Sequence, residues 1–214
     1  MTTATVLDFV HVHVPPAPGS ADARTVLLLH GTGGTERALL DLGPRIAPGV
    51  RLLGVRGQVM EAGMPRFFRR LSEGVFDEAD VAKRAGELAG FVQSAAMVYG
   101  FDVTQVVALG YSNGANIAAA LLLLHPGVLS GAMLLRTMVP LEPAVLPALG
   151  GVAVLMAEGR LDPIVPTANA ERLAALLGAA GAAVTLHWEP AGHGITPGDI
   201  DAARTFFAAG VRTG

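Results

Sequence analysis

The chain contains no cysteine and only one lysine, Lys83, among its 214 residues. Without cysteine it has no disulfide framework, no thiolate nucleophile and no cysteine-ligated metal site. Charge is also scarce, because only 15% of the residues are charged and the formal net charge is -3. A general nucleic-acid-binding protein normally carries a basic excess or a basic stripe. We therefore expect no nucleic-acid partner.

Long hydrophobic runs are missing as well. The apolar run at residues 118–124 is far too short to cross a bilayer, and residues 1–6 carry neither the basic nor the apolar region of a signal peptide. These absences predict a cytoplasmic protein without stable membrane insertion. Apolar residues nevertheless make up 51% of the chain, which at this length predicts one compact domain, residues 1–214, with a substantial core.

Short apolar segments typical of strands alternate with longer segments typical of helices. Residues 25–30 are continuously apolar until the final histidine, as expected for a strand covered on both faces. Thr196, Pro197 and Asp199 are start signals of a final helix. The alternation predicts an α/β protein with a mostly parallel central sheet flanked by helices. The expected strands are 9–14, 25–30, 51–55, 105–109, 129–135, 152–157 and 183–188, and the expected helices are 76–99, 115–121, 168–177 and 199–207.

One serine stands between two glycines in Gly110-Tyr111-Ser112-Asn113-Gly114. This matches the G-x-S-x-G pattern of a nucleophile elbow, since an expected strand precedes it and an expected helix follows it. The glycines would let strand and helix approach closely while the serine backbone makes a sharp, strained turn. Such a turn lifts the hydroxyl above the sheet and aims the N–H of Asn113 at a developing oxyanion.

A serine hydroxyl is a weak nucleophile, so Ser112 needs a histidine base that a carboxylate orients. Only three histidines follow it, His125, His187 and His193. His125 ends the elbow helix, where a capping role is expected, and His187 falls within the last expected strand. His193 stands in the loop 190–195 after that strand, from which a base can reach over the sheet. We predict His193 as the base, against the alternative of an ordinary surface histidine.

Asp162 is the predicted acid, because it follows the strand 152–157 and lies between Ser112 and His193 in the chain. An Asp-Pro pair by itself is more often a structural turn. Glu158 is the second candidate for the acid, whereas Asp199 is better placed as a helix N-terminal residue.

The loop 29–34, which contains three glycines, follows an early strand and can supply the second oxyanion donor. We predict the backbone N–H of Thr32 as this donor, paired with that of Asn113. A phosphate loop is the competing interpretation, but the sixth position of G-x-G-x-x-G is occupied by Glu36, and no G-K-[ST] follows. His30 is expected to orient the loop rather than to act as a base.

An apolar and basic stretch at residues 60–70 provides candidates for the substrate pocket. We expect Phe67 or Phe68 to form a pocket wall near Ser112, with Met64 beside them. Residues 136–138, among them Arg136 and Met138, follow another expected strand and are expected to line the same cleft. For the stretch 60–70 the alternative is ordinary packing together with a solvated face.

Residues 29–31, 110–114, 159–166 and 192–194 together resemble the phospholipase/carboxylesterase family of α/β-hydrolases, whose branch includes acyl-protein thioesterases and relatives of dienelactone hydrolase. The resemblance extends from about residue 26 to residue 207, and residues 56–68 further resemble its small bacterial carboxylesterase subgroup. It implies a serine hydrolase with no cofactor, no metal and no separate cap domain. Carried over, it implies Ser112 as nucleophile, Asp162 as acid, His193 as base, and Thr32 and Asn113 as oxyanion donors.

The expected function is therefore hydrolysis of small or short-acyl carboxylic esters through an acyl-enzyme, with a small-molecule ester as the partner. Dienelactone hydrolases use a cysteine nucleophile, which this chain lacks, and no extended acyl groove is evident. An acyl thioesterase or lysophospholipase is the first alternative. A hydrolase-fold sensor that binds a ligand without turnover is the second. A homodimer is compatible with the apolar chain, although no sequence feature marks an interface.

Overall fold

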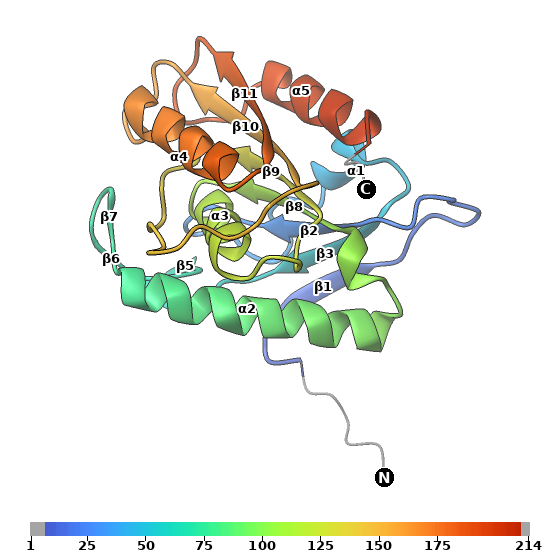
Figure 1. Ribbon diagram of the computed structural model, residues 1–214. Coiled ribbons are helices and arrows are strands. Elements are labelled where there is room, and N and C mark those ends of the chain that lie inside the picture. Colours follow the sequence, from blue (N-terminus) through green and yellow to red (C-terminus); the bar gives the residue numbers. More distant parts are fainter. Residues whose placement is uncertain (1–6, 211–214) are drawn as a thin grey trace.

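A seven-stranded sheet runs through the centre of the molecule (Figure 1). The computed structural model describes residues 7–210, so the expectation about residues 1–6 lies outside the described residues. The strand order is β1-β3-β2-β8-β9-β10-β11, and every pairing is parallel except that of β1 with β3. The strands are β1 His11–Val14, β2 Thr25–Leu29, β3 Arg51–Val55, β8 Val106–Tyr111, β9 Gly131–Leu135, β10 Ala153–Gly159 and β11 Ala183–Glu189. The predicted mostly parallel α/β architecture is confirmed.

Helices cover both faces of this sheet. On one face lie α2 (Glu78–Tyr99), α3 (Asn113–Leu124) and α4 (Thr167–Ala179), and on the other lie α1 (Gly43–Ile46) and α5 (Pro197–Ala208). Alternate residues of β2 enter the two cores: Leu27 and Leu29 join the α2–α3–α4 side, whereas Val26 and Leu28 join the α1–α5 side. The apolar run of the sequence is thus a strand covered on both faces, as predicted.

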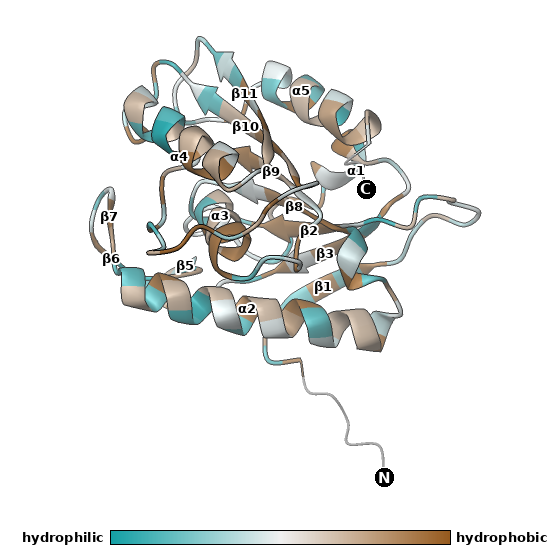
Figure 2. Cartoon of the chain, in the orientation of Figure 1, coloured by the Kyte–Doolittle hydropathy of each residue, from teal (hydrophilic) through white to brown (hydrophobic). Residues whose placement is uncertain are grey.

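The most apolar elements are the central strands and α3 (Figure 2). α3 is apolar nearly all round and has only Leu124 outside its buried set, which is typical of a helix enclosed in the core. Its N-terminus follows β8 directly, so the elbow serine is placed at the middle of the sheet.

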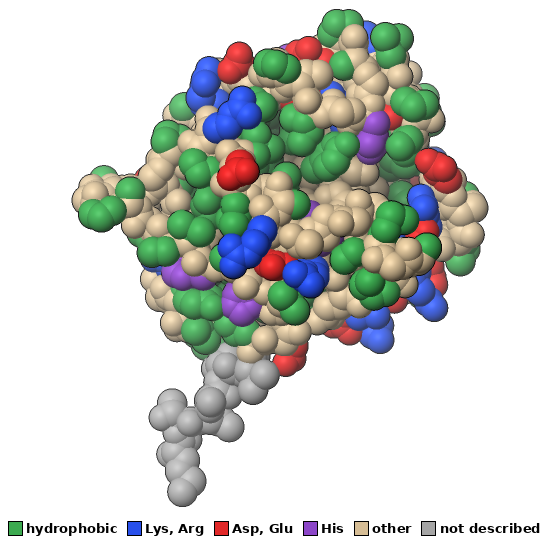
Figure 3. Space-filling model, turned by 180° about the vertical axis from the view of Figure 1, so that it is seen from behind, with side chains coloured by type: hydrophobic (Ala, Val, Ile, Leu, Met, Phe, Trp, Pro, Cys, Tyr) green, Lys and Arg blue, Asp and Glu red, His purple; other side chains and the backbone are tan. Residues whose placement is uncertain are grey.

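The outer surface is more polar. On the face shown in Figure 3, positive and negative side chains are interspersed with apolar and uncharged ones. Among residues 7–210, no helix is long and apolar enough to cross a membrane.

Helix starts follow the sequence signals closely. α5 begins with a capping box in which the Thr196 hydroxyl accepts from the Asp199 N–H and the Asp199 carboxylate accepts from the Thr196 N–H. α2 begins at Glu78 rather than at the expected Phe76, because Asp77 caps the helix by accepting from the N–H of Asp80.

Four small elements among residues 7–210 were not expected from the sequence. They are α1, the short 3-10 helix η1 (Val103–Gln105) and two hairpins, β4 (Val59–Glu61) with β5 (Met64–Arg66) and β6 (Arg70–Ser72) with β7 (Val75–Phe76). Each strand of the hairpins has at most three residues, too few for a period-two pattern to be recognised. The turn between β4 and β5 has positive φ at Ala62 and Gly63, as two-residue hairpin turns require. These hairpins lie beside the candidate site.

Candidate active site

The candidate site lies where parallel strands end at one edge of the sheet. β2, β8, β10 and β11 all point their carboxyl ends to this edge. The segments that follow them carry Thr32, Ser112, Asp162 and His193 in that order. Ligand sites of open α/β sheets form at this edge.

Ser112 forms a strained elbow between β8 and α3. Its backbone has φ 52 and ψ -117, and its N–H donates to the Leu135 carbonyl of β9 at 2.8 Å. A Cβ at Gly110 would lie 2.6 Å from the Cα of Ala115, and a Cβ at Gly114 would lie 2.0 Å from the Leu29 carbonyl oxygen. Both glycines are therefore required by the close approach of backbone segments, as the elbow pattern predicts.

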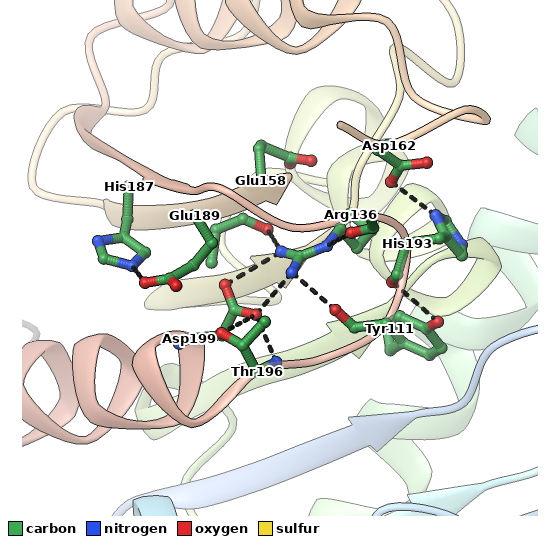
Figure 4. A network of polar contacts seen from close by, with 12 residues as sticks. Tyr111, Arg136, Glu158, Asp162, His187, Glu189, His193, Thr196 and Asp199 are labelled. Atoms are coloured by element: carbon green, nitrogen blue, oxygen red, sulfur yellow. Dashed lines mark hydrogen bonds and ion pairs between the residues drawn. The ribbon is translucent and has the colours of Figure 1, made fainter. Parts of the chain in front are cut away.

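Three side chains form one hydrogen-bonded chain at this elbow. His193 Nε2 lies 2.9 Å from Ser112 Oγ, and His193 Nδ1 lies 2.7 Å from Asp162 Oδ2 (Figure 4 for the histidine–aspartate pair). Because the aspartate can only accept, Nδ1 carries the proton and Nε2 is left to accept from the serine hydroxyl. Ser112, His193 and Asp162 thus meet although 81 and 31 residues separate the bonded pairs.

Asp162 is held in place by its own turn. Its Oδ1 accepts from the backbone N–H groups of Ile164 at 2.8 Å and Val165 at 3.2 Å, which leaves Oδ2 for the histidine. The second candidate acid, Glu158, is fully buried and accepts from the Thr137 N–H with both oxygens. Burial raises the pKa of Glu158 to about 8. The structure brings Asp162, and not Glu158, to His193.

The loop after β2 is fixed by His30 and by the β4–β5 hairpin. His30 accepts from the Gly57 N–H at 3.0 Å through Nε2 and contacts the Gly31 carbonyl at 2.6 Å through Nδ1. Burial lowers the pKa of His30, in line with a neutral ring that orients the loop. On the hairpin side, the Gly33 N–H donates to the Pro65 carbonyl.

Thr32 and Asn113 lie on the lining of the same cavity as Ser112. Within the described residues, neither backbone N–H donates a hydrogen bond to a protein acceptor. The Thr32 hydroxyl accepts from Arg66 Nη1 at 2.7 Å, and the Asn113 side-chain oxygen accepts from the Phe67 N–H at 2.7 Å. Side-chain hydrogen bonds therefore fix both cavity-lining residues, while their two backbone N–H groups have no protein acceptor in the described part of the chain.

The cavity above Ser112 has a volume of about 220 Å³. Its lining is partly polar and partly apolar. The polar lining consists of Thr32, Arg66, Arg70, Glu73, Tyr111, Asn113, Asn116 and His193. The apolar lining includes Gly74, Phe76, Met138, Ile164 and Val165, and Arg136 borders the cavity.

The expected pocket residues are only partly found there. Met138 lines the cavity, and Asn116 fixes its N–H at 2.8 Å. Phe67 and Phe68 do not line it: they are 2% and 0% exposed and belong to the main core. The prediction of a pocket wall at these positions is corrected, because their rings turn inward and Phe76 occupies the wall. Met64, the first residue of β5, is exposed and is also outside the lining.

The remaining histidines lie away from Ser112 in the hydrogen-bond network. His125 follows α3 at its C-cap, and His187 pairs with Glu189 at 2.8 Å on β11. In the part of the chain that the structure describes, no group of three or more His, Cys, Asp or Glu side chains is arranged to hold a metal ion.

Two residues at strand ends make contacts at the site that the sequence did not indicate. Tyr111, the last residue of β8, donates from its hydroxyl to the His193 carbonyl at 3.1 Å. Arg136, the first residue after β9, is fully buried and pairs with Asp199 (Figure 4). A single arginine directly after an apolar strand was the signal for Arg136, but its partner could not be identified by spacing.

Comparisons with known proteins agree on one family. The family model described as Phospholipase/Carboxylesterase matches residues 54–210. The chain belongs to the phospholipase/carboxylesterase family. It is 47% identical over 189 residues to the Putative hydrolase MhqD of Bacillus subtilis (strain 168), an alignment that covers 88% of this chain and 94% of that protein.

Solved structures of two bacterial carboxylesterases have the same fold. The carboxylesterase of Bacillus cereus is 45% identical, with a TM-score of 0.91 and 94% of each chain covered. A carboxylesterase from Mesorhizobium loti is 32% identical, with a TM-score of 0.86 and 98% of each chain covered. Family membership and these carboxylesterase neighbours support ester hydrolysis as the reaction class.

Proposed function

We propose that this protein is a serine esterase that hydrolyses small, short-acyl carboxylic esters through an acyl-enzyme on Ser112. One observation carries the proposal: Ser112, His193 and Asp162 form a continuous hydrogen-bonded chain, at 2.9 and 2.7 Å, beside a cavity. This is the arrangement by which a histidine removes the proton from a serine hydroxyl.

In the acylation step, Ser112 Oγ attacks the ester carbonyl carbon while His193 Nε2 takes the hydroxyl proton. The carbonyl oxygen becomes an oxyanion, to which the N–H groups of Thr32 and Asn113 donate. The tetrahedral intermediate then expels the alcohol, which takes the proton from His193, and the acyl group remains on Ser112. Asp162 accepts from Nδ1–H throughout, which stabilises the charged ring.

In the deacylation step, a water molecule takes the place of the alcohol. His193 removes one of its protons, and the resulting hydroxide attacks the acyl carbon. Collapse of the second intermediate returns a proton to Ser112 Oγ and releases the carboxylic acid. No group beyond those already described is needed for the balance of atoms and protons.

The size of the cavity supports the proposal that the substrates are small. Its volume of about 220 Å³ is below the roughly 300–1,000 Å³ typical of pockets for drug-sized ligands. Met138, Ile164 and Val165 supply apolar lining, and Arg66 and Arg70 supply polar lining. Such a mixed lining suits a small ester that carries both a short apolar group and a polar group.

The first test is covalent labelling with a fluorophosphonate probe, followed by identification of the labelled peptide. We expect wild type to be labelled at Ser112 and the Ser112→Ala variant to remain unlabelled. Ser130→Ala is the matched control, because the Ser130 hydroxyl donates to the Val106 carbonyl at the opposite end of the strands. Absence of labelling in well-folded wild type would refute the proposal.

The second test separates substrate classes on one enzyme preparation. Turnover is measured with p-nitrophenyl acetate, a long-chain p-nitrophenyl ester and a short acyl thioester. We expect the acetate to be the best ester, since the cavity is small. A preference for the long-chain ester would indicate the lysophospholipase alternative, and a preference for the thioester would indicate the thioesterase. Ligand binding without turnover of any of them would indicate a sensor.

A further inference from the structure

Arg136 uses every hydrogen-bond donor of its guanidinium group. Nη1 donates to the Ala157 carbonyl at 2.9 Å and to Asp199 Oδ1 at 3.0 Å. Nη2 donates to the Gly194 carbonyl at 2.8 Å and to Asp199 Oδ2 at 2.7 Å, and Nε donates to the Gly192 carbonyl at 3.0 Å. An arginine has five N–H donors in a fixed planar fork, so all five are satisfied.

These acceptors come from three separate parts of the chain. Ala157 lies in β10, Asp199 lies in the first turn of α5, and Gly192 and Gly194 are the residues on either side of His193. In Figure 4 the guanidinium of Arg136 lies between Asp199 and the loop that carries His193. One buried side chain therefore ties the His193 loop to both the sheet and the last helix.

Tyr111 holds the same loop at one further atom. Its hydroxyl donates to the His193 carbonyl, so three consecutive carbonyls, those of Gly192, His193 and Gly194, are each bound by the side chain of Tyr111 or Arg136. Glycines stand on both sides of His193, and glycine restricts the backbone conformation less than any other residue. The two side chains restrain this backbone instead.

The backbone of Arg136 is also held in a fixed and unusual conformation. Its φ is 57, a value that residues with a Cβ rarely adopt and that persists only when surrounding contacts over-determine it. The Arg136 N–H also donates to the Ala157 carbonyl at 2.9 Å. Main chain and side chain thus fix the same residue at the end of β9.

We infer that Arg136 is a positioning residue for His193, acting through the carbonyls on either side of that histidine. The inference rests on the proposed function, because it concerns the base of that reaction. The planar fork matters as well as the charge, since three separate carbonyls and one carboxylate must be bound at fixed angles. Tyr111 is the weaker, second positioning residue.

The main test is Arg136→Lys, which keeps the positive charge opposite Asp199 but cannot bind both carbonyls in the same geometry. We expect kcat to fall on the order of 10²-fold, because a small misplacement of a catalytic group has an effect of this size, while KM changes less than about twofold. The rate of fluorophosphonate labelling at Ser112 should fall with kcat. NMR should show broadening of the proton resonance of the His193–Asp162 hydrogen bond.

Tyr111→Phe is the second variant, in case Arg136→Lys does not fold. It removes one hydroxyl and keeps the ring, so it frees only the His193 carbonyl. We expect a smaller loss of kcat, of roughly threefold to tenfold, again with little change in KM.

Arg24→Lys is the matched control. Arg24 also pairs with an aspartate, Asp22, and donates to a backbone carbonyl of α5, that of Phe207, but at the far end of the helix. It should lower stability without lowering kcat. A folded Arg136→Lys with the kcat, labelling rate and NMR signal of wild type would overturn the inference, as would an equal loss of kcat in Arg24→Lys. Failure of wild type itself to be labelled would instead refute the proposed function.

Discussion

Two neighbouring strands, β8 and β9, end in the same unusual way. The residue after each strand, Ser112 and Arg136, has a positive φ of 52 or 57 although neither is glycine. The means of support differ. Around Ser112 the chain supplies glycines that let three backbone segments touch, whereas Arg136 has Leu135 and Thr137 as neighbours and is fixed by side-chain hydrogen bonds.

The same backbone conformation therefore has a different role at each of these two positions. Strain at Ser112 presents a hydroxyl to the cavity, and strain at Arg136 directs a guanidinium into the protein. A strained residue therefore does not by itself indicate chemistry. What its side chain faces decides whether it reacts or supports.

The largest effect should come from removing the hydroxyl at the first strand end. Ser112→Ala should lower kcat on the order of 10⁴–10⁶-fold, because a triad nucleophile has no substitute. Its free energy of unfolding should change by less than about 1 kcal/mol, since only one partly accessible hydroxyl is lost. Steady-state kinetics and urea denaturation test both parts. Residual turnover above about one hundredth of wild type would contradict the assignment of the nucleophile.

At the end of β9, replacing Arg136 should mainly lower the stability of the folded protein. Arg136→Met leaves Asp199 buried without its cation and should lower the free energy of unfolding by about 3–5 kcal/mol. The double variant Arg136→Met/Asp199→Asn should be more stable than Arg136→Met, because the unpaired charge is gone. Urea denaturation of the single and the double variant measures the two free energies of unfolding. Equal stabilities of the two variants would show that the ion pair is not the support of this strand end.

A third strand end, that of β10, should make stability depend on pH. Burial raises the pKa of Glu158 from 4.5 to about 8, so the folded protein keeps a proton that the unfolded chain releases. The contribution of this group to stability is therefore present below pH 4.5 and is lost as the pH rises toward 8, by up to about 1.4 kcal/mol for each pH unit.

Glu158→Gln removes this titration and can still accept from the Thr137 N–H. Its stability advantage over wild type should grow between pH 5 and pH 8 and then level off. Denaturation curves at pH 5, 6.5 and 8 measure it. An advantage that stays constant over this range would contradict the raised pKa.

The smallest effect on stability is expected from replacing a glycine that allows close packing at the end of β8. Gly114→Ala would place a Cβ against the Leu29 carbonyl, at 2.0 Å before any movement, and should lower stability by about 1–3 kcal/mol, as overpacking does. Gly90→Ala in α2 is the control, because its Cβ would meet open space. There the change should raise stability by about 0.5–1 kcal/mol. Similar destabilisation by both changes would show that close packing at the elbow is not the cause.

Much of the fold was predictable because periodic apolar segments depend on local patterns. The seven strands of the main sheet and the four longer helices lie close to where the sequence places them, and the Thr196–Asp199 capping box was read from three residues. The two short hairpins were not predicted, since strands of two or three residues have no period. The inward packing of Phe67 and Phe68 followed from those hairpins and was therefore missed as well.

For the site, the sequence alone determined the elbow at Ser112, because the spacing of its glycines follows from a local requirement of the backbone. The order of residues along the chain then selected His193 among the candidate bases and Asp162 among the candidate acids. Tertiary structure decided which side chains meet across the sheet. The partners of Arg136 stand 21 to 63 residues away, and no local pattern encodes a contact between groups so distant in the chain. Folding brings four strand ends to one edge, and only there does a buried arginine become the support of a histidine.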